Sequence, residues 1–214
     1  MEILIVAATE REILPFMGRN PRADHLITGV GSVMTTYHLT KRLQQMNYDI
    51  VIQAGIAGAF DKSIPLSSVV AVESEVFGGS GIMEKGELTS LFEAGLWKEG
   101  QPFINGSLIN SNPLIDRLPW RKVKSTSSDF LTDDAHTNGQ VYAKYKADIE
   151  SMEGAAFHFV SLTEGVSFLQ LRSISNFVGE RDKSKWKIEE SITALNEALH
   201  LLYSELISSY EAKH

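Results

Sequence analysis

The sequence contains no cysteine, which excludes disulfide bonds and thiolate metal sites. Its six histidines show neither HxH nor HExxH spacing, so we expect no metal and no other cofactor. No segment approaches the roughly 20 apolar residues that a membrane span requires. The opening MEILIVAATE has too short an apolar run for a signal peptide. These absences predict a soluble, cytoplasmic protein that does not bind membranes.

Positive charge is also scarce. The 20 basic residues are outnumbered by 27 acidic ones, and the net charge of −7 is spread without long runs. This balance disfavours a nucleic-acid partner. No GxxxxGK[ST] phosphate loop occurs, and GVGSVM has Met34 where a dinucleotide fingerprint has its third glycine. The motifs therefore do not predict a nucleotide cofactor.

Apolar runs of strand length recur along the chain. They cover residues 2–8, 25–31, 49–60, 67–76, 123–132, 147–153 and 166–174. Helical patterns follow several of them, one opened by Ser32 as its N-cap and one directly after Glu153. From Lys185 onward, one apolar stripe repeats at spacings of three and four: Ile188, Ile192, Leu195, Leu199, Leu202 and Leu206.

Strands that are apolar throughout, separated by helices, indicate an α/β fold whose central mixed β-sheet has helices on both faces. The length suits one such domain over residues 1–214, and no break in composition argues for two. Residues 81–120 carry mixed signals that do not define their elements.

Ligands of such sheets usually lie beyond the carboxyl ends of the strands. Glu12 and Glu153 both follow apolar runs, where an unpaired charge is costly to bury. Phe130 follows another strand, where an aromatic ring can stack on a base or simply fill the core. Asn176 follows the last strand, as a ligand-reading amide or as a turn residue. For Glu12, a helix-capping role is the alternative.

Several of these segments resemble one superfamily. VAATEREI, GIAGAF, SSDFLT, SMEGAAF and LRSISNFVGERD are similar to the nucleoside phosphorylase/nucleosidase superfamily, in the branch with methylthioadenosine/S-adenosylhomocysteine nucleosidase. SNFVGERDKSKW most resembles the futalosine hydrolases of the alternative menaquinone pathway. The resemblance implies a three-layer fold, a nucleoside substrate, hydrolysis without cofactors, and a homo-oligomer.

The resemblance also implies roles for individual residues. Glu12 matches the water-activating acid, and Glu153 matches the carboxylate that holds the ribose hydroxyls. The implied substrate-binding residues are Met152 beside the sugar, Ala57 and Gly58 beneath it, Phe130 stacked on the purine, Leu131 at the base edge through its backbone, and Arg172 near the catalytic water.

The chain departs from the methylthioadenosine enzymes at two positions. Ile56 replaces a serine that supports the water, and Asn176 replaces a catalytic aspartate. An asparagine amide can accept from N7–H and donate to O6 of a 6-oxopurine, whereas a 6-amino group opposes its donors. We therefore expect futalosine to be hydrolysed to dehypoxanthine futalosine and hypoxanthine. The alternatives are a 6-aminopurine nucleosidase, a purine nucleoside phosphorylase and a non-catalytic nucleoside-binding protein.

Overall fold

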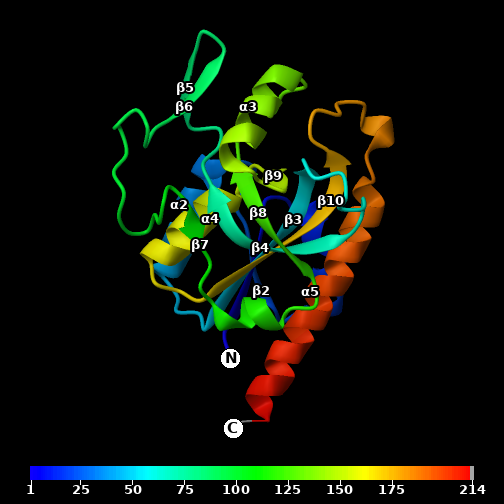
Figure 1. The fold of residues 1–214 in the computed structure, drawn as a ribbon. Coiled ribbons are helices and arrows are strands. Elements are labelled where there is room, and N and C mark those ends of the chain that lie inside the picture. The colour runs from blue at the N-terminus through cyan, green and yellow to red at the C-terminus, as the bar shows by residue number, and fades with distance from the viewer. Residues whose placement is uncertain (213–214) are drawn as a thin grey trace.

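A mixed sheet of eight strands lies at the centre of the protein, whose computed structural model describes residues 1–212 (Figure 1). Its strands are β1 (Ile3–Ala7), β2 (Asp24–Ile27), β3 (Ile50–Ala59), β4 (Val69–Val76), β7 (Leu108–Ile109), β8 (Arg121–Ser127), β9 (Ile149–Ser151) and β10 (Phe168–Phe177). The seven predicted strands are confirmed, and β7 lies in the segment 81–120 that the sequence left undefined.

The strand pairings bring distant parts of the chain together. The strand order is β10-β4-β8-β9-β3-β1-β2, with β7 beside β4, and β10 also pairs with β3. Strands β3, β10, β4, β8 and β9 thereby close into a ring, from which β1 and β2 extend. Strands β1, β3 and β10 run parallel, while β9 pairs antiparallel with the end of β3. The antiparallel pairing of β9 with β3 brings the residues just after β9 to the carboxyl ends of β3 and β10.

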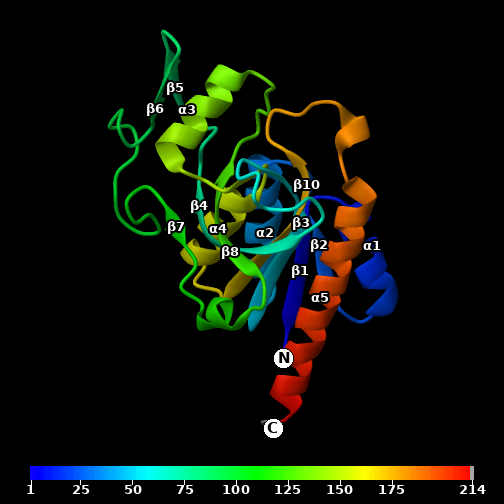
Figure 2. The same ribbon diagram turned by 45° about the vertical axis from the view of Figure 1, so that its right-hand side comes forward.

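Helices cover both faces of the sheet, as predicted (Figure 2). Helices α1 (Glu10–Arg19) and α5 (Ile188–Glu211) pack together on one face, and α2 (Ser32–Leu43) and α4 (Gly154–Thr163) pack together on the other. Two short 3₁₀ helices, η1 (Pro113–Arg117) and η2 (Lys183–Lys185), complete the connections. None of the helices in residues 1–212 combines the length and apolar character that crossing a membrane demands.

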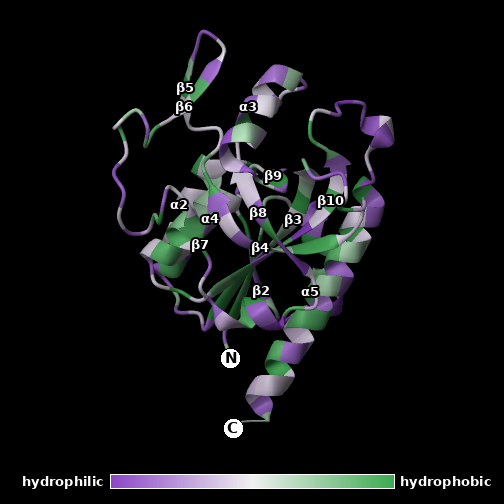
Figure 3. Ribbon diagram, in the orientation of Figure 1, coloured by the Kyte–Doolittle hydropathy of each residue, from purple (hydrophilic) through white to green (hydrophobic). Residues whose placement is uncertain are grey.

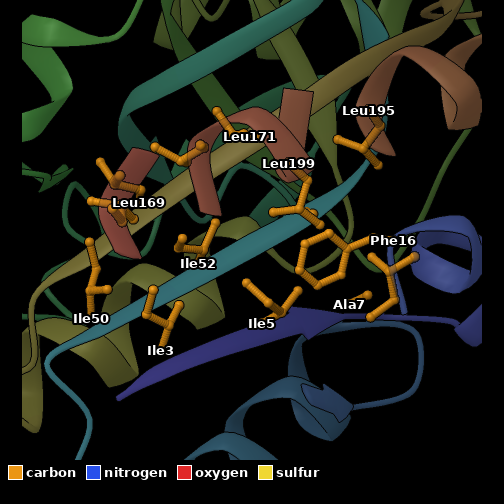
Figure 4. Close-up of a cluster of buried hydrophobic side chains, with 14 of the residues drawn as sticks. Ile3, Ile5, Ala7, Phe16, Ile50, Ile52, Leu169, Leu171, Leu195 and Leu199 are labelled. Carbon is orange, nitrogen blue, oxygen red and sulfur yellow. The ribbon is translucent and has the colours of Figure 1, made fainter. Parts of the chain in front are cut away.

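The largest core cluster lies between the sheet and helices α1 and α5 (Figure 4). Ile5 and Ile52 from neighbouring strands meet Leu199 of α5 and Phe16 of α1 there. Alternate residues of β1, Leu4 and Val6, pack on the opposite face against α2 and α4. This two-sided burial explains why the central strands are apolar throughout, and hydrophobic residues accordingly concentrate along them (Figure 3).

Three local features differ from the prediction or were missing from it. Helix α3 (Ala135–Tyr145) was not predicted, because none of its residues is buried and no apolar stripe marks it. Strands β5 (Gly81–Glu84) and β6 (Glu87–Ser90) form a separate hairpin in the segment that the sequence left undefined. Ser32 is not the N-cap of α2, so that prediction was wrong.

The N-terminus of α2 is capped from elsewhere in the chain. Gly31 occupies the N-cap position with φ of 94°, a conformation that favours glycine. The Ser32 amide and hydroxyl donate to the Asp129 carboxylate at 2.7 and 2.9 Å. Because Asp129 lies 97 residues away, the local sequence contained no sign of this cap.

Candidate active site

A cavity of about 390 Å³ opens where β1, β3, β9 and β10 end. Seven of the nine predicted site residues line it: Glu12, Ala57, Gly58, Leu131, Met152, Glu153 and Asn176. The end of β1, strand β9, the loop after β10 and the start of α5 also contribute to its walls. The fold therefore gathers these residues from five separate stretches of the chain.

Glu12 is held by three hydrogen-bond donors. It occupies the third position of α1, where its Oε2 accepts from the Thr9 amide at 3.0 Å and the Thr9 hydroxyl at 2.9 Å. Its Oε1 accepts from the Ile56 amide at 3.0 Å. The capping role and the cavity-facing role thus coexist in one side chain that is 8% exposed. Oε1 retains a lone pair for a further donor in the cavity.

Glu153 is the second buried carboxylate of the cavity, at the N-cap position of α4. It accepts from the Gly31 amide at 3.1 Å, and Arg172 Nη1 lies 3.5 Å from its other oxygen. Burial raises the pKa of Glu153, and the Arg172 charge opposes that shift. The charge of Glu12 adds a repulsion that also raises the pKa of Glu153.

Arg172 lies behind the cavity and does not line it. Its side chain is 1% exposed and donates to Gln53 Oε1 at 3.0 Å and to the Ile56 carbonyl at 3.4 Å. These contacts fix the guanidinium beneath Glu153. Arg172 is therefore placed to position the carboxylate, and its predicted proximity to the catalytic water stays a prediction.

Asn176 faces the cavity from the end of β10, at a point where the register with β3 shifts. Its Oδ1 accepts from the Ser175 hydroxyl at 2.8 Å, and its Nδ2 donates to the Phe177 carbonyl at 3.0 Å. These two bonds determine the orientation of the Asn176 amide, with its oxygen toward Ser175 and its nitrogen toward the Phe177 carbonyl. One lone pair and one N–H remain for a ligand.

The loop after Asp129 carries two residues that were predicted to contact the base, Phe130 and Leu131. Leu131 lines the cavity, whereas Phe130 does not and is 72% exposed. The Ser128 hydroxyl donates to the Phe130 carbonyl at 2.6 Å and accepts from its amide at 3.1 Å, which holds this turn. The stacking role of Phe130 therefore stays a prediction.

The cavity also contains residues that the sequence analysis did not assign. Glu150 lines it from β9, and Trp186 lines it from the loop after β10. Trp186 Nε1 donates to the Glu180 carbonyl at 2.9 Å, which folds this loop back toward the cavity. Burial raises the pKa of Glu150 to about 7, against the opposing charge of Arg181. A three-residue strand is too short for its alternation to have identified Glu150.

The site consists of two buried carboxylates beside a polar amide. Residues 1–212 contain no group of three or more His, Asp or Glu side chains that could hold a metal. Glu12 can accept a proton from a water, Glu153 can accept from hydroxyl groups, and Asn176 can bind a group that presents a donor beside an acceptor. A ribosylated heterocycle presents this combination.

Comparisons with known proteins agree with the resemblance inferred from the motifs. No protein-family profile matches the chain. The chain is 28% identical to futalosine hydrolase of Thermus thermophilus over 184 residues, covering 85% of this chain and 81% of that protein. It is 28% identical to 5′-methylthioadenosine/S-adenosylhomocysteine nucleosidase of Treponema pallidum over 185 residues, covering 73% of this chain and 67% of that protein.

A solved structure shares the fold. Futalosine hydrolase of Helicobacter pylori superposes with a TM-score of 0.80 at 18% identity, covering 95% of this chain and 97% of that one. The predicted fold class and the predicted resemblance to futalosine hydrolases and methylthioadenosine nucleosidases are thereby confirmed.

Proposed function

We propose that this protein is an N-glycosyl hydrolase that cleaves a 6-oxopurine nucleoside, with futalosine as its substrate. The products are dehypoxanthine futalosine and hypoxanthine, and the reaction belongs to menaquinone biosynthesis. One observation carries the proposal: two buried carboxylates, Glu12 and Glu153, share a cavity with the asparagine amide of Asn176. The similarity to futalosine hydrolases from several bacteria supports the same conclusion.

Glu12 is the general base in this proposal. Its Oε1 accepts a hydrogen bond from a water and takes the proton as the water oxygen bonds to C1′. The C1′–N9 bond breaks, its electron pair leaves with the base, and N7 of the base takes a proton from solvent. Glu12 then returns its own proton to solvent. The carboxylate also stabilises the positive charge that develops on the sugar. The backbone amide of Ile56 donates to Glu12 Oε1 at 3.0 Å. Because this bond does not involve the side chain, isoleucine in place of serine leaves the orientation of the Glu12 carboxylate unchanged.

Glu153 binds the 2′- and 3′-hydroxyls of the ribose. The hydrogen bond from the Gly31 amide and the pairing with Arg172 hold the carboxylate in one place, so a bound sugar is held in its reactive geometry. Met152 packs beside the sugar, and Ala57 and Gly58 lie beneath it.

Asn176 recognises the base through hydrogen bonds. Its free oxygen lone pair accepts N7–H of the departing 6-oxopurine, and its free N–H donates to O6. A 6-amino group would present donors to that N–H and leave buried groups unpaired, which sites of this kind reject strongly. Leu131 contributes backbone contacts at the base edge, and Phe130, whose exposed ring lies outside the cavity here, turns inward to stack on the purine.

Two other functions make different predictions. A phosphorylase would require phosphate near C1′, where the carboxylate of Glu12 would repel it. A 6-aminopurine nucleosidase is favoured by the similarity to the Treponema pallidum enzyme and is opposed by Asn176. We further propose that the protein acts in the cytoplasm as a homo-oligomer, as the family resemblance implies.

The test is a panel of futalosine, aminofutalosine, inosine and methylthioadenosine, assayed by chromatography for free base. We expect many hypoxanthine molecules per protein molecule from futalosine and little adenine from the 6-amino compounds. Predominant adenine release would favour the second nucleosidase, and absence of any released base would indicate a binding protein.

A further inference from the structure

Asn176, Gly58 and Glu150 lie side by side on three adjacent strands. Asn176 of β10 is in register with Gly58 of β3, and Gly58 is in turn opposite Glu150 of β9. All three line the cavity. Because neighbouring strands are about 4.8 Å apart, the Cα atoms of Asn176 and Glu150 are separated by roughly 10 Å.

Gly58, between the other two, has no side chain, and a Cβ added there would lie 3.2 Å from Val178 Cγ2 and 3.3 Å from Asn176 Nδ2. The Val178 side chain therefore lies over the Gly58 backbone beside the Asn176 amide, and it lines the same cavity. A flat ring bound in this cavity can present one part of its edge to Asn176 and the next part to Glu150.

The Glu150 carboxylate is available to a ligand. It forms no hydrogen bond or ion pair with any residue in the described part of the chain, although the Arg181 charge acts on it. Burial raises its pKa to about 7 because the charged form is poorly solvated there. A donor from a bound ligand would supply the missing partner.

We infer that Glu150 is a second specificity-determining residue, which accepts a hydrogen bond from N1–H of the 6-oxopurine. The inference rests on the proposed function, since it specifies how the same site reads its base. Along the edge of a 6-oxopurine, N7–H, O6 and N1–H follow one another as donor, acceptor and donor. Asn176 binds the first two, and Glu150 binds the third. A 6-aminopurine presents a bare N1 acceptor, which an ionised carboxylate repels.

Binding of free bases tests this role without requiring turnover. Hypoxanthine, 1-methylhypoxanthine and adenine would be titrated calorimetrically into the wild-type protein and into Glu150→Gln and Glu150→Val. Because a hydrogen bond to a charged group is lost, we expect the wild type to bind hypoxanthine about tenfold to hundredfold more tightly than 1-methylhypoxanthine. In Glu150→Val this ratio should fall to about twofold or less, since neither base then has an acceptor at N1.

Controls separate a specific effect from a general one. Glu164→Gln, an exposed acid at the end of α4, should bind the bases as the wild type does. Glu150→Gln keeps an acceptor oxygen and should retain part of the discrimination, with thermal unfolding showing that each variant is folded. An unchanged ratio in a folded Glu150→Val, or no discrimination in the wild type, would overturn the inference. Discrimination that disappears in Glu150→Val while no nucleoside is hydrolysed would support the inference and contradict the proposed function.

Discussion

The Arg172 guanidinium lies directly over Gly55. A Cβ added at Gly55 would lie 2.3 Å from Arg172 Nη1 and 2.9 Å from Glu12 Oε1. The guanidinium cannot move aside easily, because it is 1% exposed and is held by Gln53, the Ile56 carbonyl and Glu153. Glycine at this position of β3 is therefore what allows both carboxylates and the arginine to share one small volume.

The first prediction follows from this contact. Gly55→Ala should displace Arg172 or Glu12 and lower turnover by roughly 10-fold or more, since small misplacements in an active site have large kinetic effects. Gly18→Ala is the matched control, because a Cβ added at Gly18 of α1 meets no atom within 4 Å. It should leave turnover unchanged and stabilise the helix by about 0.5–1 kcal/mol. Steady-state kinetics together with urea unfolding measure both effects, and equal activity of the two variants would contradict the account.

The second prediction concerns the general base. Glu12→Gln should lower turnover by about 10² or more while nucleoside binding is largely retained, because the amide cannot take a proton from water. Glu10→Gln is the control, since Glu10 lies in the same helical turn, is exposed and does not line the cavity. Near-normal turnover in Glu12→Gln would remove this residue from the mechanism.

The third prediction concerns base recognition by Asn176. Asn176→Asp presents only acceptors to the base when ionised, so it should repel O6 and tolerate a 6-amino group. We expect futalosine hydrolysis to collapse and the preference to move toward aminofutalosine, which has the same sugar tail. The ratio of kcat/KM for the two substrates measures this change. If the ratio stays constant, Asn176 is only a turn residue.

A buried acid outside the cavity gives the fourth prediction. Glu75 of β4 is fully buried and accepts from Ser127 Oγ at 3.1 Å and from Gln170 Nε2 at 3.0 Å. Burial raises the pKa of Glu75 to about 7, while the bond from Gln170 opposes that shift. The folded state thus binds a proton more tightly than the unfolded chain does, so the contribution of Glu75 to stability decreases as the pH rises from about 4.5 to about 7.

Glu75→Gln should remove this contribution. Relative to the wild type, the variant should be more stable at pH 8 than at pH 5 by up to about 3 kcal/mol, the free energy that corresponds to a pKa raised from 4.5 to about 7. The free energy of unfolding in urea would be measured for both proteins at both pH values. Glu150 and Glu153 titrate in both proteins, so their effects cancel in the comparison. A stability difference that does not change with pH would show that Glu75 is ionised in the folded protein.

The sequence predicted the elements whose pattern reflects burial. Strands β1, β3 and β10 are covered on both faces, and α5 buries one stripe, so each carries a continuous or periodic apolar signal. Helix α3 buries no residue and left no such signal. The capping of α2 depends on Asp129, a contact between residues far apart in the chain that no local pattern encodes.

The same distinction applies to the site. Glu12, Glu153 and Asn176 were identifiable because each directly follows an apolar run, and the fold brings all three to one cavity. Glu150 was not identifiable, because its position depends on the antiparallel pairing of β9 with the end of β3. Phe130 was predicted from its place after a strand, but the local turn leaves its ring exposed.

The most direct test of the central claim is the identity of the sugar product formed from futalosine with and without phosphate. Mass spectrometry would follow the sugar, and chromatography would follow the base in the same reaction. We expect hypoxanthine and a free-sugar product at the same rate in both conditions. A sugar 1-phosphate that forms only when phosphate is present would contradict it.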